Sequence, residues 1–393
     1  RSFDRQFFDD GSNFEGSTAY HRLSGEMMVY GFGLIGRLHL TELENLRSIE
    51  IKSWDCKSPL FRPDIDWVLK PDDVWQKLHR SAVFSRAITK PDGTIVQFGD
   101  NDSGRFMTFS AQGEMVVLDD AFERYNNWQE RHLHPEMTEV FDENMLTQCA
   151  FISSVYGLLN APLDNVDFIE YTLFKHMGTN VVKLNDLAEP SMPESFGSFS
   201  DFTQWPHSVT KEFILPEGSN TNVDVHLFPD FQLATLSGDQ LFIALSGISN
   251  PNQHHSLSHV HNDKGAVELS IGRENILRDP GTYLYTPIPE RRIEFRSVHA
   301  HNTILIENRE QNEPLPGAMG LFNMHPKVSV EAMLATSTEL KVELHYNGYK
   351  HVRVVNVSDG LVSITDWCTH PFSQNFNSLN WFSNGYGKRF QTS

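Results

Sequence analysis

The hydrophobic periodicity of this chain changes near its middle, and this change constrains the fold more than any other feature of its 393 residues. In the first half, apolar residues recur at the spacing of a helix face, beginning after the capping residue Ser17 and again after Pro71. Two further helical patterns cover about 138–158 and 164–176. The first half is therefore predicted to be helical.

In the second half, apolar residues alternate with polar ones, which is typical of half-buried strands. The alternation is clear in 223–227 and 267–271. It recurs in 342–346, which leads directly to Asn347-Gly348, and Asp359-Gly360 follows soon afterwards. Both dipeptides favour tight hairpin turns. The second half is therefore predicted to be an antiparallel sheet, folded as a sandwich.

The stretch from Asn185 to His207 separates these halves and contains three prolines, a glycine and several serines, as linkers do. Two domains also suit a chain of this length. The predicted class is an α+β multidomain protein, with a helical domain over 1–190, a linker over 191–210 and an antiparallel β-sandwich over 211–393.

Composition excludes several classes of protein. The formal net charge of -19 argues against a nucleic-acid partner, because phosphate binding needs a basic surface. No apolar run reaches the length of a membrane span. The three cysteines, Cys56, Cys149 and Cys368, are too few and too far apart for a disulfide framework or a cysteine metal site.

The densest group of candidate functional residues is the segment 258–263, which contains His259 and His261. If this segment is a strand, the two histidines share one face. Asp279 follows at the entrance of a turn, and 296–303 contains two more histidines. Two imidazoles and one carboxylate from these segments would suit zinc, with a fourth position left to water or another group.

Five segments together resemble the heparinase II/III-like polysaccharide lyases. They are 10–21 (DGSNFEGSTAYH), 99–105 (GDNDSGR), 259–263 (HVHND), 279–283 (DPGTY) and 295–303 (FRSVHAHNT). Each is short, but they occur in the same order as in the family, which makes the combination specific.

The resemblance implies a fold, a reaction and a set of site residues. The helical part would be an incomplete (α/α) toroid, with substrate bound between it and the β-sandwich. Tyr20 would act in proton transfer and His259 would lie in the active cleft, while the residues His261, Asp279 and His301 would hold a structural zinc ion. The family also uses an Asn-His or His element well before the tyrosine, at a place that falls ahead of Arg1.

The implied reaction is β-elimination at a uronic acid of an acidic polysaccharide, for which a base takes the C5 proton and an acid protonates the leaving oxygen. Phenols ionise only near pH ~10, so we expect cations beside Tyr20 to lower its pKa, with Arg22, His259 and Arg296 as candidates. Glu15, Arg22, Tyr283 and Arg296 are the candidate substrate-binding residues. We expect Tyr20 and His259 to face each other across the cleft. Such a protein would meet its substrate in the periplasm or outside the cell.

Other interpretations of the same residues remain open. Tyr20 could simply be a core tyrosine, and Tyr283 and Tyr285 could line a sugar site or pack the sandwich. Asp100 and Asp102 fit a structural turn or helix cap, or else the paired carboxylates of a glycoside hydrolase. A third possibility is a non-catalytic polysaccharide-binding or assembly protein that keeps the fold and the zinc.

Overall fold

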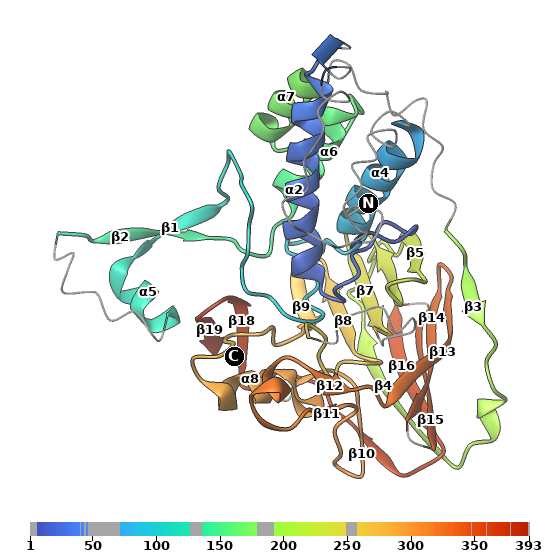
Figure 1. Ribbon diagram of the computed structural model, residues 1–393. Coiled ribbons are helices and arrows are strands. Elements are labelled where there is room, and N and C mark those ends of the chain that lie inside the picture. The colour runs from blue at the N-terminus through green and yellow to red at the C-terminus, as the bar shows by residue number, and fades with distance from the viewer. Residues whose placement is uncertain are drawn as a thin grey trace, which may run out of the picture.

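The computed structural model describes residues 6–39, 41–42, 45, 71–125, 136–178, 192–248, 258–346, 348–358, 360–377 and 379–391. Within them the chain is an α+β protein, with helices in the first half and antiparallel strands in the second (Figure 1). The predicted switch of periodicity is therefore confirmed. Cys56, Asn347, Asp359 and part of the predicted linker lie outside the described residues.

Four helices form the upper part of the molecule in Figure 1: α2 (Thr18–Gly36), α4 (Pro71–Ala87), α6 (Cys149–Leu158) and α7 (Phe168–Met177). Ser17 caps α2, as predicted, by accepting hydrogen bonds from the backbone N–H groups of Ala19 and Tyr20. The four helices share one apolar core, which contains Val29, Phe32, Leu78, Phe151, Val155 and Phe174.

The first half is not wholly helical, however. Strands β1 (Gly113–Val117) and β2 (Glu139–Glu143) form an antiparallel hairpin, and the short helix α5 (Leu118–Arg124) follows β1. The helix predicted over about 138–158 is therefore wrong in its first half: Val140 and Phe141 pair with Val116 and Met115 on the other strand, and α6 begins only at Cys149. In Figure 1 this hairpin projects sideways from the four helices.

The second half contains two large antiparallel sheets. The six-stranded sheet has the order β3 (Ser195–Gly197), β13 (Val328–Ala335), β14 (Glu339–Tyr346), β15 (Tyr349–Ser358), β16 (Leu361–Cys368) and β4 (His207–Ile214). The five-stranded sheet has the order β5 (Asp224–Phe228), β6 (Leu233–Ser237), β7 (Leu241–Ser246), β8 (Val267–Ile271) and β9 (Glu274–Leu277). Both sheets contribute to one buried core, which contains Leu236, Ile243, Leu269, Val342, Val355 and Ile364. Strand β3 and the start of β4 fall within the predicted linker, so part of that stretch is built into the sheet.

The helical part packs directly on the five-stranded sheet. Phe84 near the end of α4 contacts Phe228 and Phe231, with ring centroids 4.7 and 5.0 Å apart. The loop that follows α4 adds Val96 and Phe98 to the same buried cluster. The loop 88–102 thus lies where the helical part meets the five-stranded sheet, in contact with residues of both halves of the chain.

Shorter elements complete the sandwich side. They are η5 (Phe202–Gln204), α8 (Pro289–Arg296), η6 (Val298–Ala300), β10 (Ile304–Ile306), β11 (Glu313–Pro314), η7 (Gly317–Leu321), β12 (Met324–His325), β17 (Phe372–Gln374), β18 (Trp381–Gly385) and β19 (Lys388–Gln391). Among the described residues, no helix is both long and apolar enough to cross a membrane. Cys149 and Cys368 are free thiols.

One buried ion pair inside the sandwich carries a prediction for stability. Arg353 donates to both oxygens of Asp366 at 2.8 and 2.9 Å, and His351 lies 2.7 Å from the same carboxylate. Burial alone would raise the pKa of Asp366, but Arg353 and His351 together hold it well below its usual range. We expect Asp366→Asn to lower the free energy of unfolding by about 3–5 kcal/mol, because it leaves the Arg353 charge buried without its partner.

The pH dependence of this loss has a definite sign. A carboxyl whose pKa is depressed in the folded state stabilises the protein above its unfolded pKa of about 4, and this contribution is lost as the pH falls below that value. Urea unfolding of the wild-type protein and of Asp366→Asn should therefore show the largest difference in free energy of unfolding near neutral pH, and a smaller difference in acid. Equal stability at neutral pH would contradict the prediction.

Candidate active site and metal centre

Tyr20 is positioned by the start of helix α2. It lies in the first turn, where its backbone N–H donates to the Ser17 hydroxyl at 3.1 Å. The same hydroxyl donates to the backbone carbonyl of Asp100 at 2.6 Å. One serine therefore caps the helix and fixes it to the loop that carries Asp100.

Gly99 allows this loop to approach the histidine segment closely. Its φ is +74°, and an added Cβ would lie 2.6 Å from the carbonyl oxygen of His259 and 2.7 Å from that of Gly16. Beside it, the backbone N–H of Asp100 donates to the His259 carbonyl at 2.8 Å. His259 and His261 lie in the loop before β8 rather than on a strand, so the predicted strand was wrong at this point.

The structure brings Tyr20 and His259 together from opposite halves of the chain. Their rings are stacked, with centroids 4.0 Å apart and an interplanar angle of 29°. The Tyr20 hydroxyl donates to Asp102 Oδ2 at 2.8 Å and lies 3.2 Å from the hydroxyl of Tyr285. Tyr20 and His259 therefore lie together as expected, but in direct ring contact rather than on opposite sides of a cleft, and both side chains are partly exposed.

Glu15 adds a carboxyl group on the other side of the imidazole. Its Oε2 lies 3.6 Å from His259 Nε2, which is too long for a direct hydrogen bond, and it has no hydrogen-bond partner. Burial raises the pKa of Glu15, which favours the protonated acid. Glu15, His259 and Tyr20 thus offer three groups capable of proton transfer within one small region.

Asp100 is the hub of the site, meaning that its carboxylate contacts His259, His261 and Arg292. Its buried carboxylate accepts hydrogen bonds from Arg292 Nη1 and Nη2 at 2.6 and 2.7 Å. It also lies 3.1 Å from His259 Nδ1 and 2.8 Å from His261 Nε2. Burial alone would raise the pKa of Asp100, but hydrogen bonds from both histidines and from Arg292 keep it well below the usual range. The carboxylate is therefore ionised and fixes both imidazole rings.

This arrangement determines which ring nitrogens carry hydrogen. An ionised Asp100 requires a donor at His259 Nδ1 and at His261 Nε2. In the neutral rings, His259 Nε2 and His261 Nδ1 then hold lone pairs. His301 Nδ1 lies 2.6 Å from Asp279 Oδ2, so in the neutral ring its lone pair is at Nε2. Burial lowers the pKa of His301, but the neighbouring Asp279 raises it overall.

His261, Asp279 and His301 can each offer one ligand atom, and these atoms lie within 4.8 Å of one another. All three residues are buried. Among the buried polar atoms, His261 Nδ1 and His301 Nε2 have no hydrogen-bond partner. Burial lowers the pKa of His261 to about 4, which keeps the ring neutral as metal binding requires. Two unpaired imidazole nitrogens beside a carboxylate fit a divalent cation of borderline softness.

Three predicted substrate-binding residues do not reach this region. Arg22 is fully buried and donates to the backbone carbonyls of Met145 and Gly104, each at 2.7 Å. Arg296 is also buried, and it donates to the backbone carbonyls of residues 321 and 260. Tyr283 packs in a small apolar cluster with Leu284 and Phe295. In these three residues the terminal nitrogens of both arginines donate to backbone carbonyls, and the Tyr283 ring packs among apolar side chains.

The predicted lowering of the phenol pKa is also not found. Burial raises the pKa of Tyr20, and the neighbouring Asp102 raises it further. The pKa of Tyr285 is raised by burial and by Asp100. Both phenols therefore keep their protons at neutral pH, which suits a proton donor better than a base.

The sequence interpretation underestimated several residues that build the site. The sequence favours a turn or helix cap for Asp100 and Asp102, leaves Tyr285 between a sugar site and packing, and does not single out Arg292. The guanidinium of Arg292 lies 4.2 Å from the ring centroid of Tyr285, so one arginine holds both the hub carboxylate and a tyrosine of the site. The Gly-Asp-x-Asp segment was the available signal for the two aspartates. Asp100 also cannot serve as half of a hydrolase pair, because it is fully buried in this ion pair.

Comparison with known proteins supports the family assignment. Residues 220–378 match the family model described as heparinase II/III-like, C-terminal. This part of the chain is therefore similar to the C-terminal domain of the heparinase II/III-like family, in agreement with the resemblance seen in the sequence. No curated protein matches the chain at the sequence level.

Alignments with solved structures were also found. A heparinase III with methylated lysines aligns with a TM-score of 0.43 and 15% identity, over 100% of this chain and 50% of that chain. A second heparinase III aligns with a TM-score of 0.41 and 16% identity, over 90% of this chain and 39% of that chain. The heparan sulfate lyase HepC from Pedobacter heparinus aligns with a TM-score of 0.34 and 15% identity, over 92% of this chain and 41% of that chain. The chain spans half or less of the length of these proteins.

Proposed function

We propose that this chain carries the catalytic site of a polysaccharide lyase that cleaves a uronic-acid-containing acidic polysaccharide by β-elimination. The observation that carries the proposal is the stacking of Tyr20 on His259, with ring centroids 4.0 Å apart. The similarity of residues 220–378 to the heparinase II/III-like family supports the reaction class.

In the proposed reaction, His259 Nε2 takes the proton from C5 of the uronic acid. The electron pair forms the C4–C5 double bond, the bond from C4 to the glycosidic oxygen breaks, and Tyr20 donates its proton to that oxygen. The assignment follows from the lone pair at His259 Nε2 and from the raised pKa of Tyr20. A protonated Glu15 can donate a hydrogen bond to the substrate carboxylate, which makes the C5 proton more acidic.

We further propose that His261, Asp279 and His301 hold one structural zinc ion. When bound, the ion would join the loop of His261 to the turn of Asp279 and to the start of β10. Asp100 contacts both His261 and His259, so an ordered metal centre would also keep His259 in position against Tyr20.

The zinc proposal predicts that removal of the metal destabilises the fold. His261→Ala should remove the bound zinc and lower the thermal unfolding midpoint, because a structural metal contributes its binding free energy to folding. Metal analysis and thermal unfolding measure the two effects, and His176→Ala, on an exposed histidine near the end of α7, is the matched control. Unchanged zinc content in His261→Ala would contradict the proposal.

Two broader proposals follow from the family. Helices α2, α4, α6 and α7 would belong to an (α/α) toroid, and the protein would work in the periplasm or outside the cell, where acidic polysaccharides occur.

The alternative is a non-catalytic polysaccharide-binding protein with the same fold. The observation in its favour is that Arg22 and Arg296 are buried on backbone carbonyls, so neither can neutralise a substrate carboxylate. Incubating the full-length protein with a panel of uronate polysaccharides separates the two functions. A lyase should increase the ultraviolet absorbance of the solution as unsaturated uronate forms, whereas a binding protein should not.

A further inference from the structure

A large pocket lies next to the metal centre but apart from Tyr20 and His259. It has a volume of about 710 Å³, and its wall includes Arg278 and Pro280, which flank Asp279. Ala300, the neighbour of His301, also lines it. Neither Tyr20 nor His259 contributes to the wall. The pocket is therefore distinct from the proposed catalytic region. It lies beside the chain segments that carry the metal ligands.

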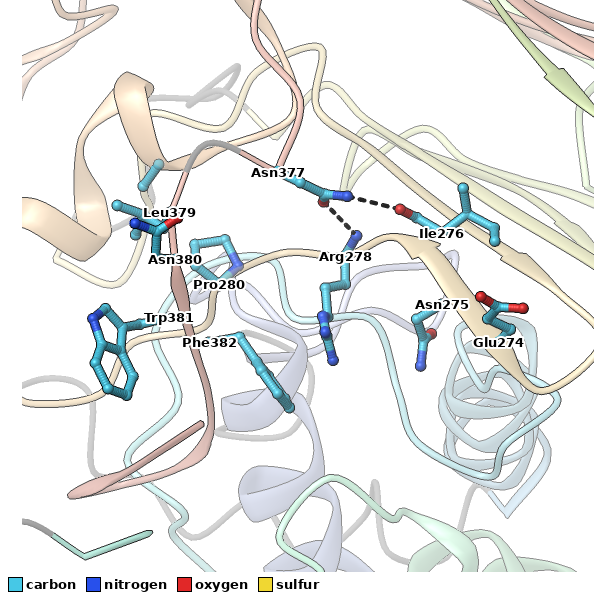
Figure 2. Close-up of a pocket in the computed structure, with 11 residues that line it drawn as sticks. Glu274, Asn275, Ile276, Arg278, Pro280, Asn377, Leu379, Asn380, Trp381 and Phe382 are labelled. Carbon is cyan, nitrogen blue, oxygen red and sulfur yellow. Dashed lines mark hydrogen bonds between the residues drawn. The ribbon is translucent and has the colours of Figure 1, made fainter. Parts of the chain in front are cut away.

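The most informative group in this pocket is the side chain of Arg278. Its guanidinium carbon lies 3.9 Å from the ring centroid of Phe382, and Figure 2 shows the two side chains next to each other. The residue is half-buried. Among the described residues its guanidinium has no hydrogen bond or ion pair, although a guanidinium offers five N–H donors.

The two carboxylates whose charges act on Arg278, those of Glu268 and Asp92, are already engaged by other donors. Glu268 forms a 3.0 Å ion pair with Lys90 and accepts the backbone N–H of Gln97. Asp92 accepts hydrogen bonds from Thr94 and from Asn275 Nδ2, the latter at 2.8 Å. The donors of Arg278 are thus left for a ligand, in a protein whose net charge is -19.

The rest of the wall has the composition of a sugar site. Trp381 and Phe382 supply apolar ring surface, and Asn380 supplies an exposed carboxamide. Glu274, at the other end of the pocket in Figure 2, supplies an exposed carboxylate that can accept hydrogen bonds from sugar hydroxyls. In Figure 2 Arg278 lies in the middle of the pocket, between Trp381 and Glu274, so an anionic group on Arg278 with hydroxyls toward Glu274 matches this distribution of charge.

We propose that this pocket is a second saccharide-binding site, which takes an anionic sugar residue with its carboxylate or sulfate on Arg278. A guanidinium binds either group through two parallel hydrogen bonds, and its packing on Phe382 orders it in advance. The choice of ligand class rests on the proposed function, whereas the existence of the site rests on the pocket itself. Such a site would hold a distant part of the polysaccharide while another part occupies the region of Tyr20 and His259.

Calorimetric titration of the full-length protein tests this proposal, in the Tyr20→Phe background so that no probe is consumed. The probes are a hyaluronan tetrasaccharide, which carries carboxylates alone, a κ-carrageenan tetrasaccharide, which carries sulfates alone, and neutral chitotetraose. Arg278→Ala should weaken binding of at least one anionic probe about tenfold or more, the usual effect of losing a charged hydrogen-bonding group. Arg309→Ala is the matched control, because Arg309 is exposed and lies outside the pocket.

The two anionic probes identify which group Arg278 recognises. Arg278→Lys keeps the charge but loses the planar fork, so it should bind less tightly than Arg278 and more tightly than Arg278→Ala. Thermal unfolding verifies that the variants are folded. Equal binding by Arg278→Ala and Arg309→Ala, or no binding of either anionic probe, would overturn the proposal.

Failure of this site and failure of the lyase can be told apart. Binding that depends on Arg278 in a protein without elimination activity would support the pocket and refute the lyase. Elimination activity together with binding that does not depend on Arg278 would support the lyase and refute the second site.

Discussion

Tyr20→Phe should reduce turnover by roughly 10²–10⁴-fold, the usual contribution of a general acid or base. The substitution removes only the hydroxyl, which donates to Asp102, and leaves the ring stacked on His259. Because the hydroxyl is partly exposed, we expect the unfolding midpoint and the zinc content to change little. Steady-state rates of unsaturated uronate formation by the full-length protein measure the effect.

Tyr171→Phe provides a matched control for this experiment. The Tyr171 hydroxyl donates to the backbone carbonyl of Ala161 within the helical part, at 2.8 Å, and has no contact with the site. Its removal should leave turnover intact. A loss below about tenfold in Tyr20→Phe, or an equal loss in both variants, would exclude Tyr20 as a proton-transfer group.

Asp100→Asn should be the most disruptive single substitution in the site. It leaves the buried guanidinium of Arg292 without a charged partner, which typically costs about 3–5 kcal/mol of stability. It also weakens the contacts that orient His259 and His261, so turnover and zinc affinity should fall together. Urea unfolding, metal analysis and rate measurements on the same preparation follow the three effects.

Asp92→Asn is the control for the loss of a carboxylate. Asp92 accepts hydrogen bonds from Thr94 and Asn275, and within the described part of the chain it forms no ion pair with an arginine. It should therefore lose much less stability than Asp100→Asn. If Asp100→Asn does not fold, Arg292→Lys keeps the charge but cannot bind both carboxylate oxygens, and it should show a smaller loss of the same three properties. Wild-type stability, zinc content and turnover in Arg292→Lys would contradict the role of Asp100 as a hub.

The elements that the sequence predicted well are those with a local signal. Ser17 marked the start of α2, and the alternation over 267–271 marked β8. Strand β15 pairs in antiparallel register with β14 and with β16, as the hairpin interpretation required. In each case neighbouring residues determine the backbone conformation, so a short window of sequence is sufficient.

Features that depend on distant contacts were predicted less well. Strand β2 falls within a predicted helix, because its conformation is stabilised by pairing with β1, which is distant along the chain. Arg22 and Arg296 looked like free cations, since a sequence does not show that backbone carbonyls surround them. The pKa of Tyr20 was expected to fall, yet burial and Asp102 raise it. The meeting of Tyr20 with His259 was anticipated only through the family resemblance.

The central claim is that the chain breaks its substrate by elimination and not by hydrolysis. Cleavage of a uronate polysaccharide in heavy-oxygen water, followed by mass spectrometry of the products, tests this most directly. Elimination adds no water, so we expect products that lack the heavy oxygen and contain an unsaturated uronate at the new non-reducing end. Products that carry heavy oxygen at the new reducing end would show hydrolysis, and tight binding without any products would show a binding protein; either result would contradict the account.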